Sequence, residues 1–312
     1  MNDQRLIHDM TLMRQTEIAV GVYAMSFAEP ALAARARPGQ FLMLSLGGGI
    51  DPYLRRPFSL AGIDRESGVI EIIYQVAGKG TQGITEWDTG RHVNVLGPLG
   101  NGFHWGADLR QAILVGGGLG IAPLLPLAKS LREQGVEVDV FLGAKSIDLL
   151  FGMHQFSDYG AQVQIATQDG SGGAAGLVTL PLEARLQTYA SAQASGNAAH
   201  TGNAAQAGSS AAQAGGSPAQ AGNATQAGGN AAQAASCLLF ACGPNPFLLA
   251  TTALCSKYAI EAQFSLEERM GCGFGACMGC SIPLLSPDGS VIQKRVCHDG
   301  PVFSAKEVLL NG

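Results

Sequence analysis

Four cysteines near the C-terminus have the spacing of metal-cluster ligands. Cys272, Cys277 and Cys280 follow one another at C-x4-C-x2-C spacing, and Cys297 comes later in the chain. This is the plant-type spacing of 2Fe-2S ligands. Glycines alternate with the cysteines, so the backbone can wrap closely around a compact inorganic core and point N–H groups at its sulfurs. The four thiols therefore predict a 2Fe-2S cluster.

A structural zinc site is the alternative for the same thiolates. Zinc modules usually carry two C-x2-C pairs separated by a longer loop, whereas here a compact triplet precedes a lone cysteine. The spacing favours the iron-sulfur cluster over zinc. Of the other cysteines, Cys237 and Cys255 are predicted to be buried apolar side chains, and Cys242 belongs to a different motif.

Residues 55–59, RRPFS, have side chains suited to a flavin dinucleotide. The guanidinium of Arg56 can make bidentate hydrogen bonds to a pyrophosphate, Pro57 stiffens the chain, and the hydroxyl of Ser59 can face the edge of the flavin ring. Taken alone, such a segment also fits the solvated end of a strand. Residues 78–81, GKGT, begin a short helical run whose N–H groups predict a second anion cradle.

A glycine run at residues 115–123, VGGGLGIAP, follows an apolar strand and begins a helix. It matches neither the G-x-G-x-x-G dinucleotide fingerprint nor a P-loop. Glycines at a strand-to-helix turn still allow a pyrophosphate or a nicotinamide to approach the backbone closely. A tight structural turn is the alternative interpretation of the same glycines.

Three styles of sequence follow one another along the chain and predict three units. Residues 17–96 contain short β-branched and aromatic stretches between turn residues, which is typical of an antiparallel barrel. After Gly106, strands and helices alternate, which predicts a parallel sheet whose final strand is 237–242. We therefore expect a flavin-binding β-barrel at 1–105, an α/β nucleotide-binding domain at 106–262 and a cluster domain at 263–312.

Residues 190–236 are rich in Ala, Gly and Gln and contain no charged side chain. Glycine recurs throughout the segment and disfavours a helix, and the segment has too few large apolar residues to form a core. We predict a disordered insertion within the α/β domain.

Overall composition narrows the range of partners. The 312 residues carry a formal net charge of -5, so no basic surface is expected for nucleic acid. The longest apolar stretch, 112–128, is broken by glycines and prolines and is too short to span a bilayer. The N-terminus shows no signal-peptide core, so we expect a cytoplasmic protein without disulfides and without a membrane partner.

Six motifs, taken in order, resemble the ferredoxin-reductase superfamily: RRPFSL, IYQVAGKGT, LGPLGNGF, GGGLGIAPL, ACGP and the terminal cysteine set. Within it, the chain is most similar to the iron-sulfur electron-transfer subunits of NAD-dependent (class 1B) dihydroorotate dehydrogenase. The likeness covers nearly the whole chain except the insertion. Its most discriminating part is ERMGCGFGACMGC together with RVCHDGPVF.

The resemblance implies particular site residues. It implies FAD contacts at Arg56, Pro57, Phe58, Ser59, Ile73, Tyr74, Gln75, Gly80 and Thr81, NAD contacts at Gly116, Gly117, Gly118, Gly120, Cys242, Gly243 and Pro244, and cluster ligands at Cys272, Cys277, Cys280 and Cys297. Ser59 and Cys242 are expected near the hydride path, with Cys242 shaping the nicotinamide pocket. The chain departs from the family pattern at the insertion and at Gln75, where a basic residue is frequent.

The three expected cofactors make chemical sense together. Nicotinamide exchanges two electrons as a hydride, a 2Fe-2S cluster exchanges one, and a flavin connects the two kinds of transfer. The resemblance implies a partner catalytic subunit that holds FMN and oxidises dihydroorotate to orotate, in a heterotetramer of two subunits of each kind. The alternatives are a flavin subunit of a hydrogenase or transhydrogenase, which would use the same cofactors, and a zinc-stabilised binding module without redox activity.

Overall fold

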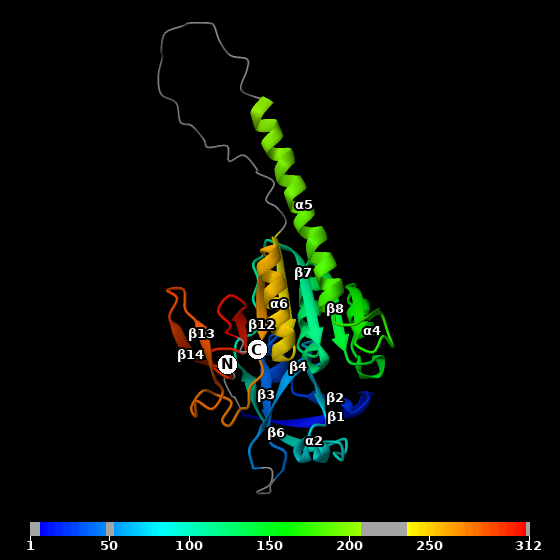
Figure 1. The fold of residues 1–312 in the computed structure, drawn as a ribbon. Helices are drawn as coiled ribbons and strands as arrows, with labels where there is room; N and C mark the ends of the chain where they lie inside the picture. The colour runs from blue at the N-terminus through cyan, green and yellow to red at the C-terminus, as the bar shows by residue number, and fades with distance from the viewer. Residues whose placement is uncertain (1–6, 48–52, 207–235, 310–312) are drawn as a thin grey trace, which may run out of the picture.

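The computed structural model describes residues 7–47, 53–206 and 236–309. Within them the chain forms a closed antiparallel barrel, a seven-stranded sheet with helices, and a two-stranded ribbon near the C-terminus (Figure 1). The predicted fold class, an antiparallel barrel followed by a parallel-sheet domain and a small cysteine-bearing unit, is confirmed. No helix in these residues is both long and apolar enough to cross a bilayer.

The barrel has the strand order β1-β2-β5-β4-β3-β6. Its strands are β1 (Ile7–Ala19), β2 (Val22–Ala28), β3 (Phe41–Leu44), β4 (Arg56–Asp64), β5 (Val69–Gln75) and β6 (His92–Leu99), with the short helices α1 (Pro30–Arg35) and α2 (Lys79–Ile84) between them. Apolar side chains alternate along these strands, so one face of each strand fills the interior. Met25, Phe27, Leu42 and Ile72 are fully buried there.

The second sheet has the order β10-β9-β8-β7-β11-β12-β15, and only β15 runs antiparallel to its neighbour. Its strands are β7 (Leu109–Gly117), β8 (Glu137–Ala144), β9 (Gln162–Thr167), β10 (Ala174–Ala175), β11 (Ser236–Cys242), β12 (Glu261–Ser265) and β15 (Val302–Ser304). The connecting helices are η1 (Gly118–Ile121), α3 (Leu124–Glu133), η2 (Ile147–Leu149), α4 (Met153–Asp158), α5 (Thr179–Gln206) and α6 (Asn245–Tyr258). The ribbon consists of β13 (Ser281–Leu285) and β14 (Val291–Arg295).

The tail is more closely joined to the sheet than the sequence suggested. The prediction that 237–242 is the final strand is wrong, because β12 adds beside β11 and β15 adds beside β12. Strand β12 also crosses the expected boundary between 262 and 263. Both added strands are short, and no turn signal separates β12 from the end of α6, so local sequence gave little warning of them.

Helix α5 reaches Gln206, so residues 190–206 are helical rather than a disordered insertion. This stretch is rich in alanine and contains only Gly196 and Gly202 as helix-weakening glycines, and alanine has the highest intrinsic helix propensity. Figure 1 shows α5 extending well beyond the sheet. Residues 207–235 of the predicted insertion lie outside the described residues.

One hydrophobic core is shared by all three units. It contains Phe41 and Met43 of the barrel, Leu239 and Phe264 of the sheet, and Val296 of the tail, all with at most 3% of their surface exposed. The three units therefore pack as one body and hold their facing surfaces in fixed positions.

Candidate functional site

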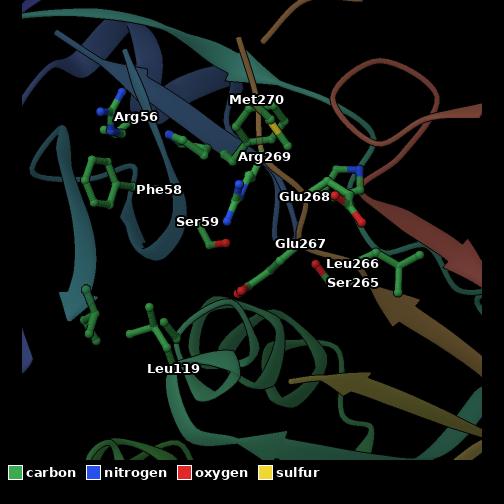
Figure 2. Close-up of a pocket in the computed structure, with 15 residues that line it drawn as sticks. Arg56, Phe58, Ser59, Leu119, Ser265, Leu266, Glu267, Glu268, Arg269 and Met270 are labelled. Carbon is green, nitrogen blue, oxygen red and sulfur yellow. The ribbon is translucent and has the colours of Figure 1, made fainter. Parts of the chain in front are cut away.

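A cavity of about 710 Å³ lies where the barrel, the sheet and the tail meet (Figure 2). The barrel contributes Phe41, Arg56, Pro57, Phe58, Ser59 and Ile73, the turn after β7 contributes Leu119 and Ala122, and the tail contributes Pro301 and the run from Ser265 through Leu266, Glu267, Glu268 and Arg269 to Met270. Five of the nine residues expected to contact FAD thus line one cavity. They come from the adjacent strands β4 and β5.

Strand pairing explains how β4 presents these side chains. Phe58 pairs with Leu42 and Ser59 with Phe41 across the β3–β4 ladder. Phe58 is buried and packs edge-on against Tyr74, with ring centroids 6.0 Å apart. The Arg56 guanidinium donates a hydrogen bond of 2.8 Å to the Leu54 carbonyl, which holds it at the start of the strand.

Four of the nine residues expected to contact FAD do not line this cavity, namely Tyr74, Gln75, Gly80 and Thr81. Tyr74 is 1% exposed, stacks on Tyr23 at 5.5 Å and donates a hydrogen bond to Gln15, and burial raises its pKa. Gly80 and Thr81 lie on α2. The Thr81 hydroxyl accepts hydrogen bonds from the N–H groups of Ala77 and Gly78, so the Gly78 donor of the expected anion cradle is already bonded.

A second cavity, of about 460 Å³, adjoins the first at the carboxyl ends of β7 and β11. It is lined by Val22, Gln75, Gly117, Gly118, Leu119, Gly120, Ala144, Lys145, Leu149, Phe151, Gly243, Pro244 and Glu267. Gln75, which was expected to contact the flavin, therefore lines the second, glycine-rich cavity and not the first. A third cavity of about 330 Å³ continues from it past Lys145 and Pro244 toward the start of α5.

The glycine run has steric reasons to lack side chains. Gly118 adopts a positive φ of 56°, which favours glycine. A Cβ on Gly120 would lie 2.7 Å from the Gly243 nitrogen and closer still to the Cys242 carbonyl. Gly116 lies within β7 and packs against Ile121, so it does not line the second cavity.

Cys242 lies behind the wall of the cavities. Its side chain is fully buried, and burial raises the pKa of its thiol, which is hydrogen-bonded to Ser265. Ser265 in turn lines the first cavity. This geometry agrees with a shaping role for Cys242 and provides no activated thiolate.

Glu267 is a site residue that the sequence reasoning missed. It lines both the first and the second cavity, and burial raises the pKa of its carboxyl group. Figure 2 shows Glu267 reaching toward Leu119 and Ser59, with Arg269 extending toward Ser59 from the same segment. Recognising β12 would have revealed it, because ligands bind beyond the carboxyl ends of parallel strands.

The four tail cysteines lie in two pairs. The N–H of Cys277 donates to the sulfur of Cys272 at 3.4 Å, and the N–H of Cys297 donates to the sulfur of Cys280 at 3.4 Å. Burial disfavours the Cys272 thiolate, but N–H groups of Cys277, Phe274 and Ala276 outweigh it and lower the pKa of Cys272 to about 6. Burial raises the pKa of Cys297 to about 12.

Arg295 fixes the loop that carries these cysteines. Its guanidinium donates to the Gly275 carbonyl at 2.9 Å and to the Asp299 carboxylate at 3.0 Å. The hydrogen bond from Arg295 holds the pKa of Asp299 well below its usual range. The bonds join the loop before Cys277 to the turn after Cys297, so both ends of the cysteine set are held together. Sequence spacing alone gave no sign of this clamp.

A closed antiparallel barrel followed by a parallel sheet, with a cavity at their junction, defines a ferredoxin-reductase-type fold. The structure of an NADH-dependent reduced ferredoxin-NADP oxidoreductase, described for flavin-based electron bifurcation, matches with a TM-score of 0.71 and 25% identity, over 99% of this chain and 92% of that one. The ferredoxin reductase of carbazole 1,9a-dioxygenase matches in fold with a TM-score of 0.58 at 17% identity, over 81% of this chain and 67% of that one.

Sequence relatives define the family more narrowly. Residues 267–309 match the family model of the iron-sulfur cluster binding domain of dihydroorotate dehydrogenase B. The electron transfer subunit of dihydroorotate dehydrogenase B (NAD(+)) from Bacillus caldolyticus is 36% identical over 304 residues, covering 96% of this chain and 98% of the relative. The subunit from Desulforamulus reducens is 30% identical and covers 97% and 98%. The chain belongs to this family of electron transfer subunits, and the resemblance found in its motifs is confirmed.

Proposed function

We propose that this chain carries electrons between a partner catalytic subunit, where dihydroorotate is oxidised, and NAD+, using a 2Fe-2S cluster and FAD. The continuity of the sites is the observation that carries the proposal. The first cavity shares Leu119 and Glu267 with the second cavity, and the segment that lines it, ending at Met270, leads directly to Cys272. Bound FAD would supply the conversion between hydride transfer and single-electron transfer.

The first cavity has the side chains that FAD needs. Arg56 can bond the pyrophosphate, because a guanidinium presents parallel N–H donors to phosphate oxygens. Ser59 offers a hydroxyl at the expected ring edge, while Pro57, Phe58 and Ile73 supply apolar walls. Tyr74 acts through its packing on Phe58, which it holds in place.

The second and third cavities suit the NAD nucleotide. The backbone is open to the second cavity at Gly117, Gly118, Gly120 and the pair Gly243-Pro244. This cavity adjoins the first, and a nicotinamide must lie at that junction to exchange a hydride with the flavin. Lys145 lines both the second and third cavities, so its ammonium group is placed for a phosphate of the nucleotide.

The cysteine geometry supports a two-iron cluster over a single zinc ion. Two pairs, Cys272 with Cys277 and Cys280 with Cys297, match two metal atoms with two thiolates each. Backbone N–H groups directed at these sulfurs stabilise the negative charge of such a cluster.

The outer side of the cysteine loop suits a protein partner. Phe274 is 53% exposed and Met278 is 52% exposed, and they flank the exposed Cys277. Exposed apolar side chains around a redox ligand are expected at an interface through which electrons leave. We infer that the partner is an FMN-containing catalytic subunit and that two subunits of each kind assemble.

Replacing Cys277 with Ser tests the proposal. Reduction of FAD by NADH should remain largely intact in the coexpressed complex, while dihydroorotate-linked reduction of NAD+ should stop, because the cluster path is interrupted. Anaerobic visible spectra before and after each reductant measure both steps. Cys237→Ser, a change outside the cysteine loop, is the matched control and should keep both. Unchanged dihydroorotate-linked turnover in Cys277→Ser would contradict the proposal.

A further inference from the structure

The side chain of Arg295 reaches both halves of the cysteine set. Arg295 is the last residue of β14 (Figure 1) and lies two positions before Cys297. Its guanidinium donates a hydrogen bond of 2.9 Å to the carbonyl of Gly275, which lies two positions before Cys277. It also bonds the Asp299 carboxylate through two N–H groups, at 3.0 Å and 3.2 Å. One planar fork therefore holds two segments that are 20 residues apart in the sequence.

The loop around Gly275 lies directly against the turn that follows Cys297. A Cβ on Gly275 would lie 2.8 Å from the Cβ of His298. The side chains of Arg295 and Asp299 are 28% and 20% exposed, so their ion pair is partly shielded from water. Hydrogen bonds are stronger in such a setting than at an open surface, because the local dielectric is lower. The contact between the fork and the loop is therefore suited to fixing the loop in one conformation.

The bond to the Gly275 carbonyl sets the direction of the next N–H group. The Gly275 carbonyl and the Ala276 N–H belong to one planar trans peptide unit, so they point in opposite directions. With the carbonyl held by Arg295, the Ala276 N–H is directed at the Cys272 sulfur. The N–H of Gly275 itself is directed at the Cys297 sulfur. The fork on Gly275 thus positions two N–H groups, one for each cysteine pair.

The orientation of these N–H groups matters more to the cysteines than the charge of Arg295. The carboxylate of Asp299 lies 3.0 Å from the guanidinium and carries the opposite charge. The fields of two opposite charges so close together largely cancel at a greater distance. Hydrogen bonds from N–H groups to ligand sulfurs remain, and they stabilise the reduced form of a cluster, which carries one more negative charge than the oxidised form.

We propose that Arg295 is a positioning residue that raises the reduction potential of the 2Fe-2S cluster. It acts through the Gly275 peptide, whose neighbouring N–H groups it aims at the ligand sulfurs. The inference rests on the proposed function, because it requires the cluster to be bound by the four tail cysteines. A higher potential favours electron transfer from the partner subunit onto the cluster, which is the step that brings electrons into this chain.

Replacement of Arg295 with lysine separates position from charge. Arg295→Lys keeps the positive charge but replaces the planar fork with one ammonium group, which cannot bond the Gly275 carbonyl and both carboxylate oxygens of Asp299 in the same way. Arg295→Gln removes the charge and the fork together. Lys294→Gln is the matched control, because Lys294 precedes Arg295 on β14 and its side chain lies on the opposite face of the ribbon.

A redox titration of the intact, cofactor-loaded complex tests the proposal, with the electron paramagnetic resonance signal of the reduced cluster as the readout. Arg295→Lys should lower the equilibrium constant for one-electron reduction of the cluster roughly tenfold, which is a shift of about 59 mV to lower potential. Arg295→Gln should lower it at least as far. Lys294→Gln should change it by less than about twofold, because an exposed charge is screened. The flavin potentials, read from visible spectra, should stay unchanged in all three variants.

The other outcomes separate this inference from the function on which it rests. An unchanged potential in Arg295→Lys would overturn the positioning role, whether or not Arg295→Gln shifts it. An equal shift in Lys294→Gln would also overturn it, because the effect would then be a general field. Iron analysis of each variant shows whether the cluster is loaded. Loss of iron from Arg295→Gln alone leaves Arg295→Lys to decide, and loss from both would overturn the proposal, since Arg295 would then retain the cluster rather than tune it. If the unaltered complex gave no signal of a reduced 2Fe-2S cluster, the proposed function itself would fail.

Discussion

The turn after β7 depends on a residue with no side chain at position 120. An added methyl group there would meet the backbone of Cys242 and Gly243, which cannot move aside as a flexible side chain can. We expect Gly120→Ala to force the two turns apart, to cost about 1–3 kcal/mol of unfolding free energy, and to weaken NAD+ binding. Urea unfolding and titration with NAD+ measure the two effects.

Gly83→Ala is the control for that substitution. Gly83 lies within α2, its added Cβ would meet nothing within 4 Å, and it has no positive φ. Alanine is favoured over glycine inside a helix by up to about 1 kcal/mol, so this variant should be as stable as the unaltered protein or slightly more so. If Gly120→Ala were equally harmless, the close approach of the two turns would be contradicted.

Local motifs were enough to predict part of the candidate site. The cysteine set and residues 56–59 are continuous or closely spaced in sequence, so their chemistry could be predicted before their positions were known. The positions of Tyr74, Gly116 and Cys242, all buried behind the cavities, could not be predicted in the same way. Burial depends on which strands become neighbours, and a sequence motif does not contain that information.

Helix α5 is held to the sheet by its first half. Leu182 and Leu186 are fully buried there, and Lys257 of α6 forms an ion pair of 2.6 Å with Glu183. Leu180, on the same helix, is 59% exposed. We expect Leu186→Ala to cost about 2–5 kcal/mol through loss of packing and Leu180→Ala to cost little, as measured by urea unfolding. Equal costs would contradict the packing of α5 described here.

Helices and strands with a clear hydrophobic periodicity were predictable from the sequence, and very short strands were not. The apolar stretches at β7 and β8 and the amphipathic run at α3 have the lengths and periods of buried strands and a surface helix. Strand β15 has three residues and β12 has five. Segments of that length gain their structure from the sheet edge they join, so the tail's contribution to the sheet could not be read from the sequence.

The cluster and the fold are coupled across the whole molecule. Cys280 and Cys297 belong to the same core as Phe41 and Met43 of the barrel, and a Cβ on Gly273 would lie 3.0 Å from the Met43 sulfur. We expect removal of iron by a chelator to destabilise the barrel as well as the tail, lowering the Tm by roughly 5 °C. Circular dichroism measures the unfolding of the backbone, and flavin fluorescence measures the unfolding of the barrel.

Coincident transitions from the two probes are expected, because a shared core unfolds cooperatively. The intact complex treated with the chelator already saturated with iron is the control and should keep its Tm. Loss of the cluster with an unchanged barrel transition would show that the tail unfolds independently and would contradict the shared core.

Strands β12 and β15 tie together both ends of the segment that carries the cysteines. Gln263 pairs with Ser304 and Ser265 with Val302, and the Leu266 N–H donates to the Pro301 carbonyl at 2.9 Å. The segment between them is therefore a loop clamped at its base, beside the cavity proposed for the flavin. Electron tunnelling slows exponentially with separation, so a clamped base protects the transfer rate from thermal motion of the loop.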